Sequence, residues 1–153
     1  MLHDLLSPDA VMPALRASNK KQAIQYLAAH AAELWRLPER DVFETLLQRE
    51  RLGSTGIGNG IAIPHGKLPA VQQPVGLFAR LEKPIDFDSV DGEPVDLVFL
   101  LLAPEEAGAD HLKALARVSR FLKRADVREK LRSARGTDEL YALFAGAVHS
   151  DAA

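Results

Sequence analysis

Apolar residues recur at helical spacing in several segments of the chain, and each such stripe predicts a helix with one buried face. The stripes are Ala23, Ile24, Leu27, Ala28, Ala31, Leu34 and Trp35; Val42, Phe43, Leu46 and Leu47; Leu112, Leu115, Val118 and Leu122; a short set around residues 127–131; and Leu140, Leu143 and Phe144. Ser18 or Asn19 is predicted to cap the first helix, and Gly53 to end the second. Asp110 and Thr137 are predicted to cap two later helices.

Three other segments have the pattern of strands. Residues 75–82 alternate between apolar and other positions, which predicts a strand with one buried face. Residues 95–103 are almost all apolar, which predicts a central strand covered on both faces and ended by Pro104. Residues 11–15 could form a strand only at an edge of the sheet, because Pro13 has no N–H to donate. Helices before, between and after these strands indicate a three-layer α/β domain.

A glycine-rich stretch lies between the second helix and the first long strand. Five of the ten glycines fall within residues 53–66, which read GSTGIGNGIAIPHG. We predict a flexible, glycine-lined loop and then a very short strand at residues 61–63. Strand pairing should stop at Pro64, which lacks an N–H. His65 would then lie just past the strand end, where Gly66 lets the backbone turn and leaves one face of the imidazole open.

Length and composition narrow the class of protein. The 153 residues, 47% hydrophobic and 26% charged, are typical of one soluble globular domain spanning residues 1–153. A formal net charge of −2 does not indicate nucleic acid or an anionic membrane as a partner. The absence of cysteine excludes disulfides, thiol catalysis and cysteine zinc sites. We recognise no signal peptide and no membrane span, so we expect a cytoplasmic protein that is not embedded in a membrane.

Three familiar motifs do not fit the glycine-rich stretch. A Walker A loop needs four residues between its first glycine and its Gly-Lys pair, but five separate Gly60 from Gly66. A dinucleotide-binding fingerprint fails because Ile61 stands at its last glycine position. A zinc site would need a third ligand beside His65 and His111, and nothing in the sequence identifies one.

The histidine of this stretch has two interpretations. A neutral imidazole is a competent nucleophile towards phosphorus near pH 7. Ser54, Thr55 and Asn59, together with backbone N–H groups, could bind the oxygens of a phosphoryl group on His65. His111, expected at a helix N-terminus, would also favour phosphate there. From residue types and spacing, a phosphohistidine carrier and a structural histidine at a strand end remain equal alternatives.

Other charged and polar residues have simpler interpretations. Arg49 lies in the last turn of a predicted helix, where a cation favours the helix dipole; an orientation towards His65 is the less favoured interpretation. The acids within residues 86–93 fit no calcium-binding loop and are predicted to surround a solvated Asp-Gly turn. His30 lies off its helix stripe and is interpreted as solvated, and His149 is assigned to a frayed C-terminal tail.

The stretch GSTGIGNGIAIPHGK resembles the active-site signature of type-2 EIIA domains, the fructose/mannitol class of the bacterial phosphoenolpyruvate-dependent phosphotransferase system. The resemblance covers residues 5–146, and the further matching segments are LLQRERLGSTG, PIDFDSVDGEPVDLVFLLLAP and DHLKALARVSRFL. The Pro-His-Gly-Lys ending and the free-standing domain are most similar to the nitrogen-regulatory EIIA. The resemblance implies a mixed, roughly five-stranded sheet with helices on both faces.

The resemblance also implies roles for individual residues. His65 would accept a phosphoryl group on Nε2 from phosphohistidine of an HPr-like carrier, with His111 holding the group and Arg49 compensating its charge. The oxygens would be cradled by Ser54, Thr55, Asn59 and Gly66, with no metal and no cofactor.

Two outputs follow from the resemblance. The phosphorylation state would regulate partners such as potassium transporters or sensor kinases, or the group would pass to a cysteine of an EIIB domain. A phosphate-binding module without a covalent intermediate is the alternative from another class.

Overall fold

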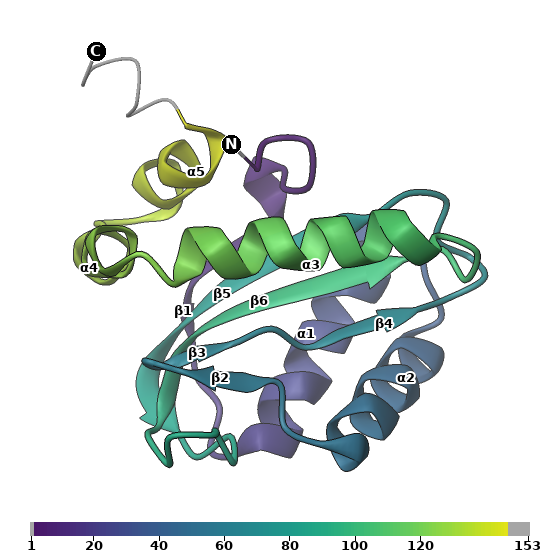
Figure 1. The fold of residues 1–153 in the computed structure, drawn as a ribbon, viewed down its shortest axis with the longest axis horizontal. Coiled ribbons are helices and arrows are strands. Elements are labelled where there is room, and N and C mark those ends of the chain that lie inside the picture. The colour runs from purple at the N-terminus through teal and green to yellow at the C-terminus, as the bar shows by residue number, and fades with distance from the viewer. Residues whose placement is uncertain (1, 147–153) are drawn as a thin grey trace.

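The structure is a mixed β-sheet with helices on both faces (Figure 1). This computed structural model describes residues 2–146 of the chain. The strands are β1 Val11–Leu15, β2 Gly56–Gly58, β3 Ile61–Ala62, β4 His65–Lys67, β5 Val75–Ile85 and β6 Val95–Ala103. Their order is β1-β5-β6-β3-β2, and β4 pairs with β6 farther along the edge that β3 also occupies. The predicted fold class is confirmed, with six strands where about five were expected.

The two longest strands, β5 and β6, run antiparallel in the middle of the sheet. β6 has the predicted bounds and is buried along almost its whole length. β5 continues to Ile85, beyond its predicted end at residue 82. The prediction that β5 has only one buried face is wrong, because Phe78 on its other face is fully buried. The ring of Phe144, from the last helix, covers it at a centroid distance of 4.7 Å.

The edge position of β1 is confirmed. Among the strands of residues 2–146, β1 pairs only with β5, in parallel, and the register shifts between Met12 and Leu15 around Pro13. The carbonyl of Pro13 accepts a hydrogen bond from Arg80 Nε at 3.0 Å. An edge strand tolerates this proline because its missing N–H removes no hydrogen bond from the interior of the sheet.

The helices form two layers and a group at one end of the sheet. They are α1 Lys20–Trp35, α2 Glu39–Leu52, α3 Gly108–Leu122, α4 Ala125–Ser133 and α5 Thr137–Ala145, with a 3₁₀ turn at Pro8–Ala10. In Figure 1, α3 crosses in front of β5 and β6, whereas α1 lies behind the sheet and α2 lies near β4. Helices α4 and α5 lie together at the end of the sheet nearest β1.

Two of the predicted helix ends are confirmed. Asn19 caps α1, and its side-chain oxygen accepts a hydrogen bond from Gln22 N at 2.8 Å. Gly53 ends α2 with a positive φ of 154°, a conformation that a residue with a side chain rarely adopts.

Two other predicted caps are wrong. Asp110 lies inside α3, because the chain already turns at Ala107, whose N–H bonds to the carbonyl of Pro104 at 3.1 Å. Thr137 is the first residue of α5, and Gly136 occupies the N-cap position. In both places the backbone turn began earlier than the capping residue that the sequence suggested.

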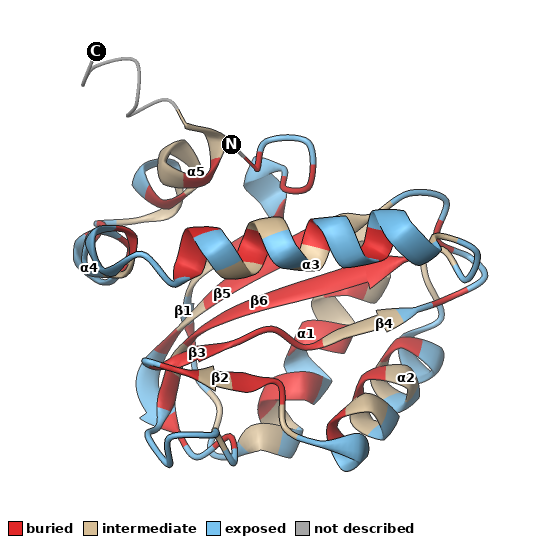
Figure 2. Ribbon diagram, viewed as in Figure 1, coloured by how far each residue is buried: buried red, intermediate tan, exposed pale blue. Residues whose placement is uncertain are grey.

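The buried stripe of α3 is also displaced from the prediction. Leu112 is 67% exposed, whereas His111 is only 5% exposed and belongs to the buried stripe. The buried residues are His111, Ala114, Val118, Phe121 and Leu122, which follow helical spacing as well as the predicted leucine set does. The choice between the two stripes depends on the sheet, which α3 covers with its buried face (Figure 2). This choice brings His111 inwards.

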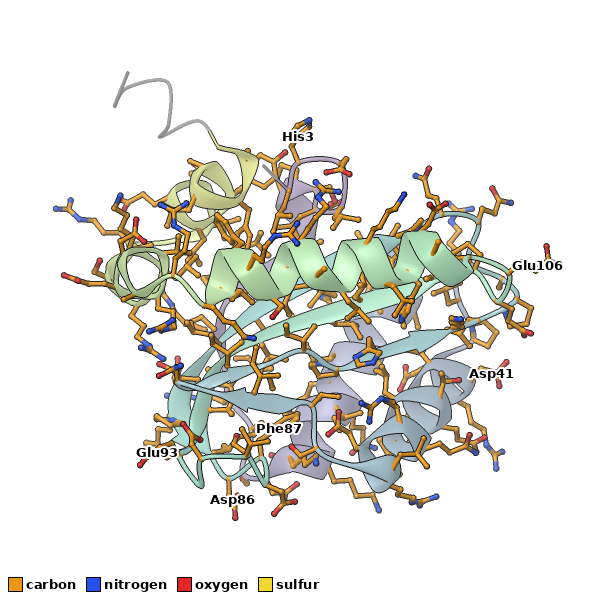
Figure 3. The ribbon with its side chains drawn as sticks, viewed as in Figure 1. His3, Asp41, Asp86, Phe87, Glu93 and Glu106 are labelled. Atoms are coloured by element: carbon orange, nitrogen blue, oxygen red, sulfur yellow. The ribbon has the colours of Figure 1, made fainter. Side chains whose placement is uncertain are left out.

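The acidic loop after β5 combines exposed carboxylates with one buried ring. Asp86 and Glu93 are exposed and point away from the sheet, whereas Phe87 is fully buried (Figure 3). Ser89 O accepts a hydrogen bond from Gly92 N at 3.0 Å, which confirms the predicted turn. No helix among residues 2–146 is long and apolar enough to cross a membrane. His149 lies outside the described residues.

Candidate functional site

The glycine-rich stretch is a β-hairpin, so the prediction of a flexible loop is wrong. β2 and β3 pair antiparallel, with Gly58 opposite Ile61. Asn59 and Gly60 connect them with positive φ values of 58° and 79°, as a two-residue turn with a left-handed pair of residues requires. The Asn-Gly pair is a strong signal for such a turn, and it explains why the stretch is ordered.

His65 lies past the end of β3, as predicted, but it also begins a further strand, β4. The carbonyl of Pro64 accepts a hydrogen bond from Leu101 N at 2.9 Å, and β4 then pairs in parallel with β6 from His65 onwards. The predicted break is confirmed, since β3 ends at Ala62 and Pro64 lies in no strand. Pairing resumes at His65 because proline lacks only the donor, and its carbonyl still joins the ladder. The strand holds the backbone of His65 rigidly, while its side chain remains half-buried.

The hydrogen bonds of the His65 ring select one tautomer. Nδ1 lies 2.8 Å from the carbonyl oxygen of Ile63, which can only accept, so Nδ1 carries the hydrogen. Nε2 is then unprotonated, and it accepts a hydrogen bond from Arg49 Nε at 3.3 Å. The orientation of Arg49 towards His65, the less favoured interpretation of the sequence, is confirmed. The lone pair available for chemistry is therefore on Nε2.

His111 is the second histidine of the site. Its ring centroid lies 5.6 Å from that of His65, with the ring planes at 50°. The side chain is buried, and its Nδ1 has no hydrogen-bond partner among the described residues. Burial lowers the pKa of His111, and the nearby cationic forms of His65 and Lys67 lower it further. His111 is therefore a neutral ring beside the ring of His65.

The pKa of His65 is also lowered. Burial is the largest cause, and the charge of Arg49 acts in the same direction. The carbonyl of Ile63 and the carboxylate of Glu50 oppose this shift by favouring the protonated ring. Because the ordinary pKa of histidine is 6.5, the lowered pKa keeps His65 neutral near pH 7. The arrangement can thus present a nucleophilic nitrogen beside a guanidinium.

Ser54 and Asn59 make hydrogen bonds to elements other than β4, which carries His65. The hydroxyl of Ser54 donates to the carbonyl of Phe87, at the loop that follows β5. Asn59 lies at the tip of the hairpin, where its N–H donates to Asp91 and its carbonyl accepts from Arg132. These contacts fasten the hairpin to its neighbours, and they revise the predicted cradling role of both residues.

Thr55 is engaged by a carboxylate that the sequence reasoning missed. Glu50 is 7% exposed, and it accepts hydrogen bonds from both the N–H and the hydroxyl of Thr55. The predicted cradling role of Thr55 is revised for the same reason, since both of its donors are used. One signal could have identified Glu50: a carboxylate in the last turn of a helix opposes the helix dipole, so another contact must hold it there.

Gly66 lets α2 approach β4 closely, and it does not form the predicted turn. It lies in the extended strand β4 opposite Leu102. A Cβ atom at this position would lie 2.6 Å from Cγ2 of Thr45 on α2. Thr45 is one helical turn before Arg49, so the missing side chain at Gly66 lets α2 bring Arg49 to the ring of His65.

Replacing Gly66 by alanine should therefore destabilise the fold and disturb the site. We expect the free energy of unfolding to fall by about 1–3 kcal/mol, because the stiff threonine side chain cannot move aside without strain. As α2 moves away, Arg49 should depress the pKa of His65 less, and that pKa should rise. Urea unfolding and NMR titration of the imidazole measure both effects. Adding T45S to G66A removes the obstructing methyl, so the double variant should recover the free energy of unfolding and the pKa of His65. A double variant as unstable and as shifted in pKa as G66A would contradict this explanation.

The described residues contain no group of three or more histidine, cysteine, aspartate or glutamate side chains placed to hold a metal ion. Of the predicted site residues, the structure brings together His65, His111 and Arg49, with Gly66 beside them.

Comparison with known proteins identifies the family. Residues 4–146 match the family model described as "Phosphoenolpyruvate-dependent sugar phosphotransferase system, EIIA 2". The chain is 61% identical over 142 residues to a nitrogen regulatory protein of Bradyrhizobium diazoefficiens, covering 93% of each chain. It is 41% identical over 132 residues to a PTS system fructose-specific EIIA component of Haloferax volcanii, covering 86% of each. The crystal structure of nitrogen regulatory protein IIA-Ntr from Neisseria meningitidis superposes with a TM-score of 0.87 at 35% identity, covering 92% of this chain and 97% of that one.

Proposed function

Because this chain belongs to the EIIA 2 family of the phosphoenolpyruvate-dependent sugar phosphotransferase system, we propose that it carries a phosphoryl group on Nε2 of His65. The donor is the phosphohistidine of an HPr-like carrier, and the phosphorylation state regulates partner proteins. The strongest support is the tautomer of His65: its Nδ1–H bonds to the carbonyl of Ile63, which leaves the Nε2 lone pair beside Arg49. A histidine with only a structural role needs no unprotonated nitrogen at a guanidinium.

In the proposed reaction, the Nε2 lone pair of His65 attacks phosphorus in line with the bond to the donor's histidine. That bond breaks, and the donor nitrogen keeps its electron pair and later takes up a proton. Nε2 then has no lone pair for Arg49, so the guanidinium is free to bind the phosphoryl oxygens. The Nδ1–H bond to Ile63 stabilises the positive charge that develops on the ring.

His111 and Arg49 have complementary roles in this proposal. Arg49 supplies a permanent positive charge, since guanidinium does not lose its proton. His111 is a neutral ring that can donate one hydrogen bond to a phosphoryl oxygen, and its unpartnered Nδ1 gains nothing from the unphosphorylated site. A dianionic phosphoryl group would also raise the lowered pKa of His111, because opposite charges favour its protonated form.

The similarity to nitrogen regulatory proteins favours a regulatory output. A phosphoryl group adds nearly two negative charges to the surface at His65, which changes what can bind there. Potassium transporters or sensor kinases are the kind of partner we expect. The similarity to a fructose-specific EIIA component supports the second candidate, transfer to a cysteine of an EIIB domain.

The proposal is tested by phosphorylation with isotopically labelled phosphoenolpyruvate, enzyme I and an HPr-like carrier. We expect stoichiometric labelling that survives denaturation and base but is lost in acid, as for a phosphoramidate. Absence of label with a donor that labels another EIIA protein would refute the proposal. Label that dissociates on denaturation would indicate non-covalent phosphate binding, and transfer to an added EIIB domain would establish the transport function.

Phosphoryl transfer should resist mild acidity. His65 reacts as the neutral ring, and its pKa lies below the ordinary 6.5, so protonation removes the nucleophile only below that pH. We expect a constant transfer rate as the pH falls towards 6.5 and a decline at lower pH, measured in single-turnover experiments with a pre-phosphorylated donor. NMR titration of the ring should give the same midpoint. A rate that already halves above pH 6.5 would contradict this prediction.

A further inference from the structure

Glu50 is a buried carboxylate for which the transfer reaction as described has no use. It lies in the last turn of α2 and is 7% exposed. A buried charge is costly unless it is paired and hydrogen-bonded. Glu50 meets both conditions: Lys20 Nζ lies 2.9 Å from Oε1, Thr55 N donates to Oε1 at 3.0 Å, and the Thr55 hydroxyl donates to Oε2.

The partners of Glu50 come from separate parts of the fold. Lys20 is the first residue of α1, and Thr55 precedes the first strand of the hairpin. The ammonium of Lys20 also lies 4.9 Å from the centre of the Phe87 ring. One carboxylate therefore fixes the C-terminal end of α2 against α1, the hairpin and the loop after β5.

Two paths lead from Glu50 to the ring of His65. Along the first, Arg49 is the preceding residue on α2 and bonds to Nε2. Along the second, Thr55 accepts a hydrogen bond from Ile63 N at 3.0 Å, and the carbonyl of Ile63 accepts from His65 Nδ1 at 2.8 Å. The groups that bond to the two ring nitrogens are thus both placed through this carboxylate.

We propose that Glu50, held by Lys20 and Thr55, is a positioning residue that sets α2 and the hairpin so that Arg49 and Ile63 bracket the His65 ring. This inference rests on the proposed phosphoryl transfer and deepens it. Glu50 does not touch the reacting atoms. Its effect is on the tautomer of His65 and on the distance from Arg49 to Nε2.

The test compares E50Q with the wild type in single-turnover transfer from the phosphorylated carrier. We expect the maximal rate constant to fall roughly tenfold, because small misplacements at a reacting centre are costly. The carrier concentration for half-maximal rate should not change, since Glu50 is buried and cannot contact the carrier. The exposed glutamate Glu44, on the same helix, provides the control variant E44Q, which should transfer at the wild-type rate.

An independent measurement separates misplacement of the site from a change in the protonation of His65. Loss of the Glu50 charge should lower the pKa of His65 in E50Q, because that carboxylate favours the protonated ring. A lower pKa leaves His65 more fully neutral, so slower transfer could not then be attributed to protonation. A folded E50Q with the wild-type rate constant and an unchanged His65 titration would overturn the proposal.

If E50Q does not fold, two variants of Thr55 decide the question. T55S keeps the hydroxyl that donates to Glu50 and should transfer at nearly the wild-type rate. T55V keeps the shape but removes the hydroxyl, and it should be several-fold slower; equal rates would overturn the positioning role. Wild-type protein that accepts no phosphoryl group would refute the proposed function. The NMR titration of His65 in T55V, which keeps the Glu50 charge and removes the contact, would still decide whether Glu50 positions the ring.

Discussion

Replacing His65 by glutamine should lower phosphoryl transfer by about three orders of magnitude or more, to the background of the assay. The glutamine amide is similar in size to the imidazole edge but has no nitrogen lone pair with which to attack phosphorus. The remaining site, including Arg49 and His111, cannot replace it. His111 also has an imidazole, but the residue is only 5% exposed, and its ring centroid lies 5.6 Å from that of His65.

The measurement is the labelling reaction with phosphoenolpyruvate, enzyme I and the HPr-like carrier, followed over time. H30Q is the matched control, because His30 contacts the carbonyl of Asp9 through Nε2 at 3.1 Å and has no contact with the site. H30Q should be labelled as the wild type is. If H65Q were labelled as fast as the wild type, the phosphoryl group would be elsewhere and the assignment of His65 would fail.

Replacing Phe144 by alanine should lower the free energy of unfolding by about 3–5 kcal/mol. Phe144 is fully buried, and its ring centroid lies 4.7 Å from that of Phe78, 5.7 Å from Phe99 and 5.3 Å from Phe121. These rings belong to β5, β6 and α3, so α5 closes the core that both long strands share. Removing the ring leaves a cavity that three rigid aromatic neighbours cannot fill.

Urea unfolding at constant pH measures this effect. Leu112 provides a control within α3, because it is 67% exposed and L112A should change the stability by no more than about 0.5 kcal/mol. The structure also implies that F144A reduces stability without removing the reacting groups, so folded F144A should still be labelled. If F144A lowered the free energy of unfolding by less than about 1 kcal/mol, the packing of α5 against this core would not contribute as proposed.

Much of the architecture was predictable from the sequence because local patterns determine it. The continuous apolar run of β6 has no alternative to burial on both faces, and its bounds were confirmed. The helical stripes of α1 and α2 and the edge position of β1 follow equally from spacing and from Pro13. The errors arose where two local solutions have similar free energies, as with His111 and Leu112 on α3, and the contact with the sheet decided between them.

The sequence by itself determined the family, the fold class and the identity of His65 as the candidate nucleophile, because these depend on residue types at fixed spacing. Only the tertiary structure decided that the glycine-rich stretch is a hairpin, that Arg49 faces Nε2, and that His111 is buried beside it. Only the tertiary structure, likewise, revealed the buried carboxylate of Glu50. The physical reason is that these contacts join residues of different helices and strands. Their distances and pKa values depend on how α2, α3 and the hairpin pack around β6, and no single segment encodes that packing.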